Sequence, residues 1–328
     1  MIPVSSPLFQ GNEKKYLQQC IDNGWVSSDG YFVQKFEEKF AKWSGNKYAI
    51  AVCNGTAALE TAIWAMKLKF IVIPSSTIIS CVLAAIRVGC VFDFDDYSFE
   101  PKKVTYNRMY CHLFGKLDNI ISNSYTMDDL SQYWKPYKVE FVGAYSLYAN
   151  KLITSGEGGI IVTNKKEIYE QAKSYRNLCH SKERFVHNDL GYNFRMSNLQ
   201  GAVALAQLEQ IDKFTEIKQK NRDLYKEYLP DTVKILFDVE VPWMYLIETK
   251  FDAGIIVKKL FLKGIDCRRF FYPLHRQPCL KRIDDRKYKQ KDFPNSDYIW
   301  EHRFYLPSGL TLTQKQIGYI CKTLGEIL

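Results

Sequence analysis

The residues best suited to chemistry lie in the run Tyr145–Gly159, which reads YSLYANKLITSGEGG. A strand-like aromatic stretch carries Ser146, Asn150 and then Lys151 to the mouth of a glycine-rich turn. A lysine amine loses its proton readily when it is partly desolvated beside other cations, and the neutral amine can condense with an aldehyde. The alternative is a solvated loop lysine. The run therefore predicts a lysine that captures an aldehyde cofactor.

A second candidate site is Asn54-Gly55-Thr56-Ala57, which joins an expected strand to an expected helix. Glycine lets the backbone approach an anion closely, and the free amides and dipole at a helix N-terminus attract phosphate. Thr56 can also cap the helix. The alternative is a plain capped turn, and the local sequence favours neither.

The third candidate is Asp128, which follows the strand-like run ISNSYTM. Ligands of α/β sheets bind at the carboxyl ends of strands. In a pyridoxal phosphate enzyme, a carboxylate there pairs with the ring nitrogen and keeps it protonated. Asp129 is adjacent, and one of the two residues can instead cap the following segment. An anion cradle, a carboxylate and a lysine, in this order along one sheet, form a coherent cofactor site.

The composition is that of an ordinary globular protein. The 328 residues are 46% hydrophobic and 25% charged, and the longest apolar stretches are too short or too interrupted to span a membrane. The N-terminus shows no secretory signal, so a soluble cytoplasmic protein is expected. The net charge is +9, but basic residues are interleaved with acidic ones rather than gathered on one arm. A basic surface suited to an anionic small substrate is expected, rather than a nucleic-acid-binding protein.

The nine cysteines indicate a reducing compartment, because they form no C-x-x-C pair and their number is odd. Two Cys-His pairs, Cys111–His112 and Cys179–His180, invite a metal site. Adjacent side chains point in different directions, however, and no second pair stands at zinc spacing. No metal site is expected.

The elements that must position these residues alternate along the first two-thirds of the chain. Short apolar runs such as 48–53, 70–73 and 90–95 predict strands, and 32–43, 57–67 and 78–88 predict helices. Further strands are expected at 109–113, 120–127, 141–148 and 159–162, and one long helix or two in tandem at 197–229. The alternation predicts an α/β fold with a mostly parallel sheet covered on both faces. After Pro230 the pattern changes, which predicts a large domain at residues 1–229 and a smaller α+β domain at 230–328.

Several longer strings make the sequence resemble a known family. They include NGTAAL at 54–59, PSST at 74–77, NKLITSGEGG at 150–159, GYNFRMSNLQGA at 191–202 and YPLH at 272–275. The chain resembles the DegT/DnrJ/StrS sugar-nucleotide aminotransferases, nearly end to end, and is most similar to their perosamine synthetase branch. The resemblance implies fold type I of the pyridoxal 5'-phosphate (PLP) enzymes, with a seven-stranded sheet between helices.

The resemblance also implies roles for particular residues. Lys151 would be the lysine that binds PLP and carries protons, and Asp128 would pair with the pyridine nitrogen. Ser131, three positions further on, and Ile78 would also contact the cofactor. Those expected to hold the phosphate are Gly55, Thr56, Ala57 and Ser146, with Asn193 reaching it from the other subunit of a homodimer. Those expected near the sugar nucleotide are Trp25, Ser28, Arg184, His187, Arg195 and His275, with ordinary structural roles as the alternative.

The implied reaction is transamination from L-glutamate, which leaves as 2-oxoglutarate. The amino group passes to C4 of a nucleotide-linked 4-keto-6-deoxyhexose and gives a 4-amino-4,6-dideoxy sugar of the perosamine or viosamine type. Lys151 would act as the general acid and base. The alternatives are a C3-keto sugar aminotransferase and a binding protein without catalysis. Sugar deoxygenation is disfavoured, because that branch replaces the lysine with histidine.

Two positions depart from the family pattern. Family members usually have an aromatic residue on the cofactor ring just after the P-S-x-T string, where this chain has Ile78. Three residues after the aspartate they usually have Gln, His or Glu, whereas Ser131 stands there, with Gln132 next to it. The segment between Asp95 and Asp128 is also short for the family. An aliphatic Ile78 still covers one ring face, so weaker stacking is expected.

Overall fold

The computed structural model of the chain describes residues 1–96, 103–104, 106–117, 121–122, 125–183, 185–283 and 293–328. Its largest feature is a seven-stranded sheet in the order β1-β9-β8-β7-β5-β2-β3. These strands are β1 (Tyr48–Val52), β2 (Phe70–Pro74), β3 (Val91–Asp95), β5 (Arg108–Cys111), β7 (Thr126–Asp129), β8 (Val142–Ser146) and β9 (Gly159–Thr163). The neighbours from β8 to β3 pair in parallel, and β9 runs antiparallel to both β8 and β1. A short parallel pair, β4 (Lys103–Val104) and β6 (Ile121–Ser122), stands apart.

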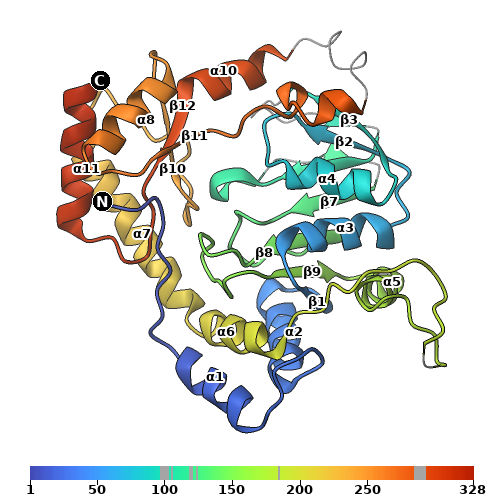
Figure 1. The fold of residues 1–328 in the computed structure, drawn as a ribbon. Helices are drawn as coiled ribbons and strands as arrows, with labels where there is room; N and C mark the ends of the chain where they lie inside the picture. The colour runs from blue at the N-terminus through green and yellow to red at the C-terminus, as the bar shows by residue number, and fades with distance from the viewer. Residues whose placement is uncertain (97–102, 105, 118–120, 123–124, 184, 284–292) are drawn as a thin grey trace.

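Helices cover both faces of this sheet (Figure 1). One face packs against α3 (Gly55–Ala65), α4 (Ser80–Arg87) and α5 (Lys166–Arg176), and the other against α2 (Tyr31–Ser44) and α6 (Asn198–Leu208), with α1 (Glu13–Asp22) beside α6. Buried strand residues are apolar toward both layers, because a parallel sheet is enclosed on both sides. The sheet therefore has two separate hydrophobic cores, and its strand ends are held rigidly.

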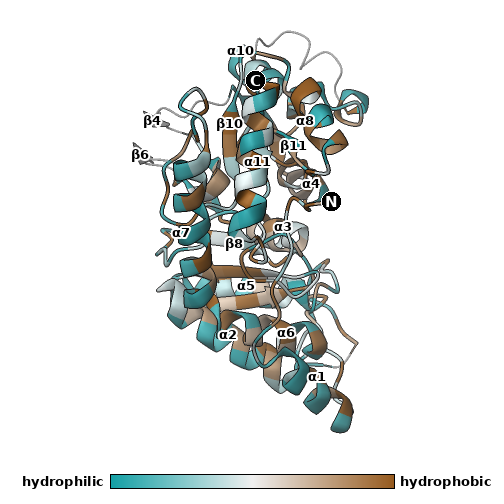
Figure 2. Cartoon of the chain, turned by 90° about the vertical axis from the view of Figure 1, so that its left-hand side faces the viewer, coloured by the Kyte–Doolittle hydropathy of each residue, from teal (hydrophilic) through white to brown (hydrophobic). Residues whose placement is uncertain are grey.

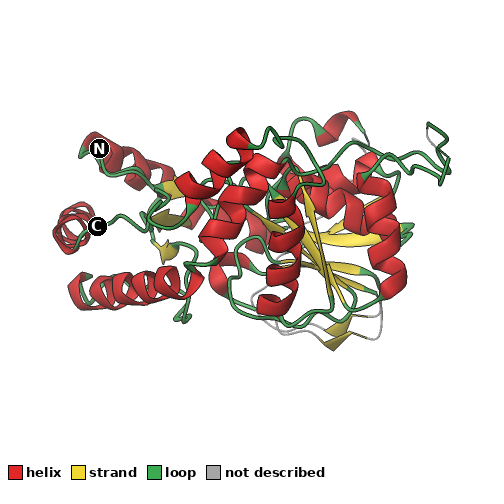
Figure 3. Ribbon diagram, turned by 90° about the horizontal axis from the view of Figure 1, so that it is seen from below, coloured by secondary structure: helices red, strands yellow, loops and turns green. Residues whose placement is uncertain are grey.

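The C-terminal part is built on a smaller antiparallel sheet, in the order β10 (Tyr245–Glu248), β12 (Arg303–Leu306) and β11 (Arg268–Arg269). It packs with α8 (Ala253–Leu262), α10 (Pro294–His302) and α11 (Gln314–Ile327), and with the end of α7 (Ile211–Tyr228). Three single turns, η1 (Leu113–Gly115), η2 (Leu274–Arg276) and η3 (Leu280–Arg282), lie in connections. Both chain ends lie on the side of the molecule formed by this part (Figure 3).

The surface helices α2 and α7 are amphipathic, as Figure 2 shows by the alternation of polar and apolar residues along them. Among the described residues, no helix combines the length and the apolar character needed to cross a membrane.

The expected α/β architecture with a mostly parallel sheet is confirmed. The segment 197–229 forms two helices in tandem, broken at Glu209–Gln210. The apolar run 233–237 contributes only a single bridge, between Ile235 and Ile247. Helices α1, α5 and α10 and strand β12 were not predicted. The small sheet lies after residue 230, but the division into two domains at that point stays a prediction.

Candidate active site

A cavity of about 630 Å³ opens where β7 and β8 end and α3 begins. Its volume is in the range of small-molecule sites. One wall comes from α3, α4 and the ends of the sheet strands, and another from the C-terminal part of the chain. Its lining residues include Gly55, Thr56, Ala57, Ile78, Ser80, Asp129, Ser131, Gln132, Ser146, Asn150, Lys151 and Trp243.

Lys151 lies in this cavity, just after β8. Burial of its amino group lowers its pKa to about 8, although the carboxylate of Asp129 acts in the opposite direction. At neutral pH, therefore, a larger share of this amine is unprotonated than in an ordinary lysine. The side chain thus has the electronic character needed for a nucleophile, and later for a proton carrier.

Trp243 holds Lys151 from the C-terminal side. The Nζ atom of Lys151 lies 4.8 Å from the centre of the indole ring, and the indole Nε1 donates a hydrogen bond to the carbonyl of Asn150 at 3.0 Å. The ring therefore contacts the lysine side chain and also fixes the main chain next to it. Trp243 itself is buried.

The start of α3 forms an anion cradle. Asn54 caps the helix, since its Oδ1 accepts from the amide of Ala57 at 2.8 Å. The amides of Gly55 and Thr56 have no acceptor among the described residues, whereas that of Ala57 is engaged by the cap. A side chain at Gly55 would not fit, because its Cβ would lie 2.8 Å from the Cβ of Ser146. Glycine thus leaves the two free amides and the Ser146 hydroxyl facing the same space.

Ser80 extends this cradle from the first turn of α4. Its hydroxyl lies 3.0 Å from the hydroxyl of Thr56. Ser80 could not be singled out from the sequence, because its closeness to Thr56 depends on how α4 packs beside α3.

The structure does not bring Asp128 into the cavity. Neighbouring strand residues point to opposite faces of a sheet, and Asp128 and Asp129 are neighbours at the end of β7. Asp128 faces the α2 side, where its Oδ1 lies 3.0 Å from Nε2 of the buried His112. Asp129 faces the cavity, near Lys151. The carboxylate available to a ligand is therefore that of Asp129, one residue later than expected.

If Asp129 rather than Asp128 faces the ligand, the residue three positions later is Gln132 rather than Ser131. Gln132 lines the cavity, and its Oε1 accepts a hydrogen bond from the amide of Phe114 at 2.9 Å. Ser131 lines the cavity too, and its amide donates to Oδ1 of Asp129 at 3.0 Å. The departure noted at Ser131 arose from counting three residues from Asp128. Counted from Asp129, the third residue is Gln132, which is one of the types usual in the family.

Ile78 lines the cavity as expected, with 37% of its surface exposed. The helix α4, which begins two residues after Ile78, contains no aromatic residue. The aromatic side chains of the cavity belong to other segments, and Trp243 is the one nearest Lys151 among the described contacts.

The residues expected near the sugar nucleotide do not gather at this cavity. Trp25 is exposed and lines a separate hollow beside α1 and α2, where its Nε1 donates to the carbonyl of Ser28. His275 is held at the end of β2 by Ser75, at 2.7 Å from Nδ1 to Oγ, and burial lowers its pKa. Both residues lie outside the lining of the first cavity.

The other expected residues belong to the loop after α5, which projects from the body of the molecule (Figure 1). His187 bonds the carbonyl of Leu178 at 2.7 Å, and Arg195 donates to Oδ1 of Asn177 at 2.6 Å. Asn193 is exposed and lies outside the cavity of its own chain. Arg184 lies outside the described residues.

The cavity fits pyridoxal 5'-phosphate. The two free amides at the start of α3 and the hydroxyls of Thr56, Ser80 and Ser146 suit a phosphate, and Asp129 suits a protonated ring nitrogen. Lys151 offers the amine for the aldehyde.

The sequence was compared with known proteins. The pattern of the DegT/DnrJ/EryC1/StrS aminotransferase family matches residues 7–106 and 138–325. A GDP-perosamine synthase of Escherichia coli O157:H7 is 31% identical, over 99% of this chain and 98% of that protein. A GDP-perosamine synthase of Vibrio cholerae is 29% identical over the same shares.

Solved structures share the fold. Helicobacter pylori PseC, an aminotransferase involved in the biosynthesis of pseudoaminic acid, superposes with a TM-score of 0.86 at 17% identity and covers 99% of this chain and 98% of its own. The resemblance, the fold class and the cofactor predicted from the sequence are confirmed. The chain belongs to the DegT/DnrJ/EryC1/StrS aminotransferase family of PLP-dependent sugar aminotransferases.

Proposed function

We propose that the protein transfers an amino group from L-glutamate to C4 of a nucleotide-linked 4-keto-6-deoxyhexose, giving a 4-amino-4,6-dideoxy sugar nucleotide and 2-oxoglutarate. The observation that carries the proposal is the presence of Lys151 and Asp129 in one cavity beside the free amides of α3. The choice of a 4-keto sugar is supported by two relatives named GDP-perosamine synthase that align over almost the whole chain.

Each residue has a part in this proposal. When bound, PLP supplies an aldehyde that accepts amino groups and a ring that withdraws electrons. Lys151 would hold the aldehyde and would then move a proton between the cofactor and the substrate carbon that loses or gains the amino group, for which a pKa of about 8 is well matched to neutral pH. Asp129 takes the role first expected of Asp128 and keeps the ring nitrogen charged. Gly55, Thr56, Ser80 and Ser146 orient the phosphate.

The proposal includes a homodimer with shared active sites. Asn193 would reach the phosphate of the other subunit, because it is exposed and lies outside its own cavity. The same loop exposes Phe185 and Leu190 by 75% and 86%, and apolar side chains this exposed are typical of surfaces that meet a partner.

The dimer has a direct test in complementation. Lys151→Ala and Asn193→Asp subunits are each expected to lose most activity as homodimers. Mixed dimers contain one site with both native residues, so an equal mixture should regain about a quarter of the wild-type activity. No gain on mixing would show that Asn193 serves its own subunit.

We also assign the protein to the cytoplasm. All nine cysteines are unpaired, and eight of them are at least partly buried. Free thiols in this number suit a reducing compartment.

The substrate is tested with a panel of 4-keto-6-deoxyhexoses linked to GDP, UDP and dTDP, together with a 3-keto isomer. Product formation with L-glutamate, followed by NMR assignment of the aminated carbon, identifies the reaction. Amination at C4 is expected. Amination at C3 would instead favour the C3-keto aminotransferase, and PLP uptake without turnover of any sugar would favour the binding protein.

A further inference from the structure

Both oxygens of the Asp129 carboxylate have protein donors. Oδ1 accepts from the amide of Ser131 at 3.0 Å, and Oδ2 accepts from the thiol of Cys81 at 3.3 Å. Asp129 is only 5% exposed and Cys81 is fully buried, so neither contact has water as a ready substitute. The orientation of a buried carboxylate is therefore set by the protein groups that donate hydrogen bonds to it.

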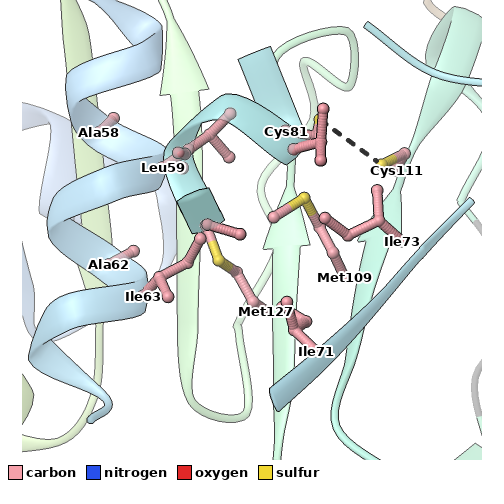
Figure 4. Packing of buried hydrophobic residues seen from close by; sticks show 14 of the residues in the cluster. Ala58, Leu59, Ala62, Ile63, Ile71, Ile73, Cys81, Met109, Cys111 and Met127 are labelled. Atoms are coloured by element: carbon pink, nitrogen blue, oxygen red, sulfur yellow. Dashed lines mark hydrogen bonds between the residues drawn. The ribbon is translucent and has the colours of Figure 1, made fainter. Parts of the chain in front are cut away.

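The environment of Cys81 keeps its thiol a donor. Its Sγ lies 4.0 Å from Sγ of Cys111 and 3.8 Å from the hydroxyl of Thr77 (Figure 4 shows the pair of thiols). The contact with Cys111, and then burial, raise the pKa of the Cys81 thiol well above its usual value. The thiol therefore stays protonated at neutral pH, which is the state that donates to a carboxylate.

On α4, Cys81 is the neighbour of a residue that belongs to the anion cradle. Cys81 follows Ser80, whose hydroxyl contacts Thr56 in the anion cradle. The first turn of α4 thus contacts the cradle through one residue and the carboxylate through the next. It sets the spacing between the two groups that would hold opposite ends of one cofactor.

We propose that Cys81 is a positioning residue, whose thiol fixes the Asp129 carboxylate so that its remaining acceptor sites face the cofactor's ring nitrogen. This inference rests on the proposed function, because it assigns Asp129 to that nitrogen. The side chains of Cys81, Cys111 and Asp129 also offer ligand atoms within 4.8 Å of one another. A protonated thiol is a poor metal ligand, so hydrogen bonding is the role that this chemistry favours.

The test compares three variants, each purified without PLP and then supplied with it. Cys81→Ala removes the donor and Cys81→Ser keeps one. Cys90→Ala is the matched control, because Cys90 is buried in the same hydrophobic core and has no contact with Asp129. The affinity for PLP is measured by titration, the melting temperature by calorimetry, and kcat and KM for glutamate at saturating PLP.

The expected results separate positioning from packing. Cys81→Ala should weaken PLP binding by roughly 5- to 10-fold and lower kcat by a similar factor, with KM for glutamate little changed. Cys81→Ser should restore both to within about two-fold. Cys90→Ala should lower the melting temperature as much as Cys81→Ala does, while leaving PLP affinity and kcat at the wild-type level.

Two results would overturn the inference while leaving the proposed function intact. One is wild-type PLP affinity and kcat in Cys81→Ala. The other is an equal loss in Cys81→Ser and Cys81→Ala, which would point to packing rather than a donor. Failure of the wild-type protein to take up PLP would instead refute the proposed function.

Discussion

The indole ring of Trp243 lies against the amino group of Lys151, with 4.8 Å between Nζ and the ring centre. The two residues are far apart in sequence and come from opposite sides of the cavity. Trp243 is in turn fixed by Lys218 of α7, which donates to its carbonyl at 2.9 Å. A chain of contacts thus runs from a buried lysine in α7, through the tryptophan, to the lysine in the cavity.

Lys218 is expected to be important for stability. Its amino group also donates to the carbonyl and hydroxyl of Ser308, so Lys218→Met would leave three buried acceptors without their donor. The free energy of unfolding should fall by about 2–4 kcal/mol, measured by urea denaturation. The exposed Lys220, on the same helix, provides the control variant Lys220→Met, which should change it by less than about 0.5 kcal/mol.

The loss of stability caused by Lys218→Met should depend on pH. Burial lowers the pKa of Lys218 to about 7, below its ordinary value of 10.5. Between these two values the unfolded chain binds the proton more strongly than the folded chain, so this site adds stability as the pH rises. The cost of Lys218→Met should therefore be larger at pH 9 than at pH 7. A smaller cost at pH 9 would contradict the lowered pKa.

The two neighbouring aspartates should respond differently to the same change. Asp129→Asn should lower kcat by on the order of a hundred-fold or more, because an amide cannot hold the charged ring nitrogen. Asp128→Asn should mainly lower the melting temperature, since it weakens the buried contact with His112. Steady-state kinetics and calorimetry measure the two effects. A larger loss of kcat in Asp128→Asn would return the role to Asp128.

Ile78 offers a gain-of-affinity test. An aromatic ring beside another ring adds about 0.5–1.5 kcal/mol beyond the area that it buries, so Ile78→Phe should tighten PLP binding by roughly 2- to 10-fold. Leu83→Phe adds a ring to α4, five residues after Ile78 and outside the cavity lining, and serves as the control. Unchanged or weaker binding in Ile78→Phe would show that the ring does not lie against this residue.

The capture of PLP by the apoprotein should depend on pH in a way that reports on Lys151. Only the unprotonated amine attacks the aldehyde, and with a pKa of about 8 its share rises with pH and levels off above that value. Stopped-flow absorbance from about pH 6 to pH 10 measures the rate, with a free lysine derivative as the reference. A rate that is still rising steeply between about pH 9 and pH 10, as for the free amine, would show that Lys151 is not desolvated.

Much of the site could be predicted because it is local. Gly55, Thr56, Ser146 and Lys151 each lie at the junction of one strand and one turn, so short strings fix their place. Which of the two aspartates faces the cavity could not be decided from the local sequence. Two adjacent carboxylates at a strand end face opposite layers, and only the register of β7 in the sheet decides which one meets the cavity. Gln132, three residues after Asp129, was the signal that could have found it.

Other parts depend on contacts that no local pattern contains. Trp243 reaches Lys151 only because the C-terminal part folds back over the sheet. Cys81 meets Asp129 only because α4 packs beside α3 on one face of the sheet. Helix α5 is polar on average and buries only Ala172, Tyr175 and Arg176, so it contains no long apolar run that would mark it in the sequence. The role proposed for Asn193 depends on a second subunit, which a single chain does not contain.

The most direct test of the account is the first half-reaction with L-glutamate. The purified wild-type protein is incubated with PLP, fixed with borohydride and digested, and a parallel sample receives L-glutamate before the borohydride. The account predicts that the cofactor is attached to the peptide containing Lys151, that prior glutamate abolishes the attachment, and that Lys151→Ala shows none. Attachment at another lysine, or attachment that glutamate leaves unchanged, would contradict it.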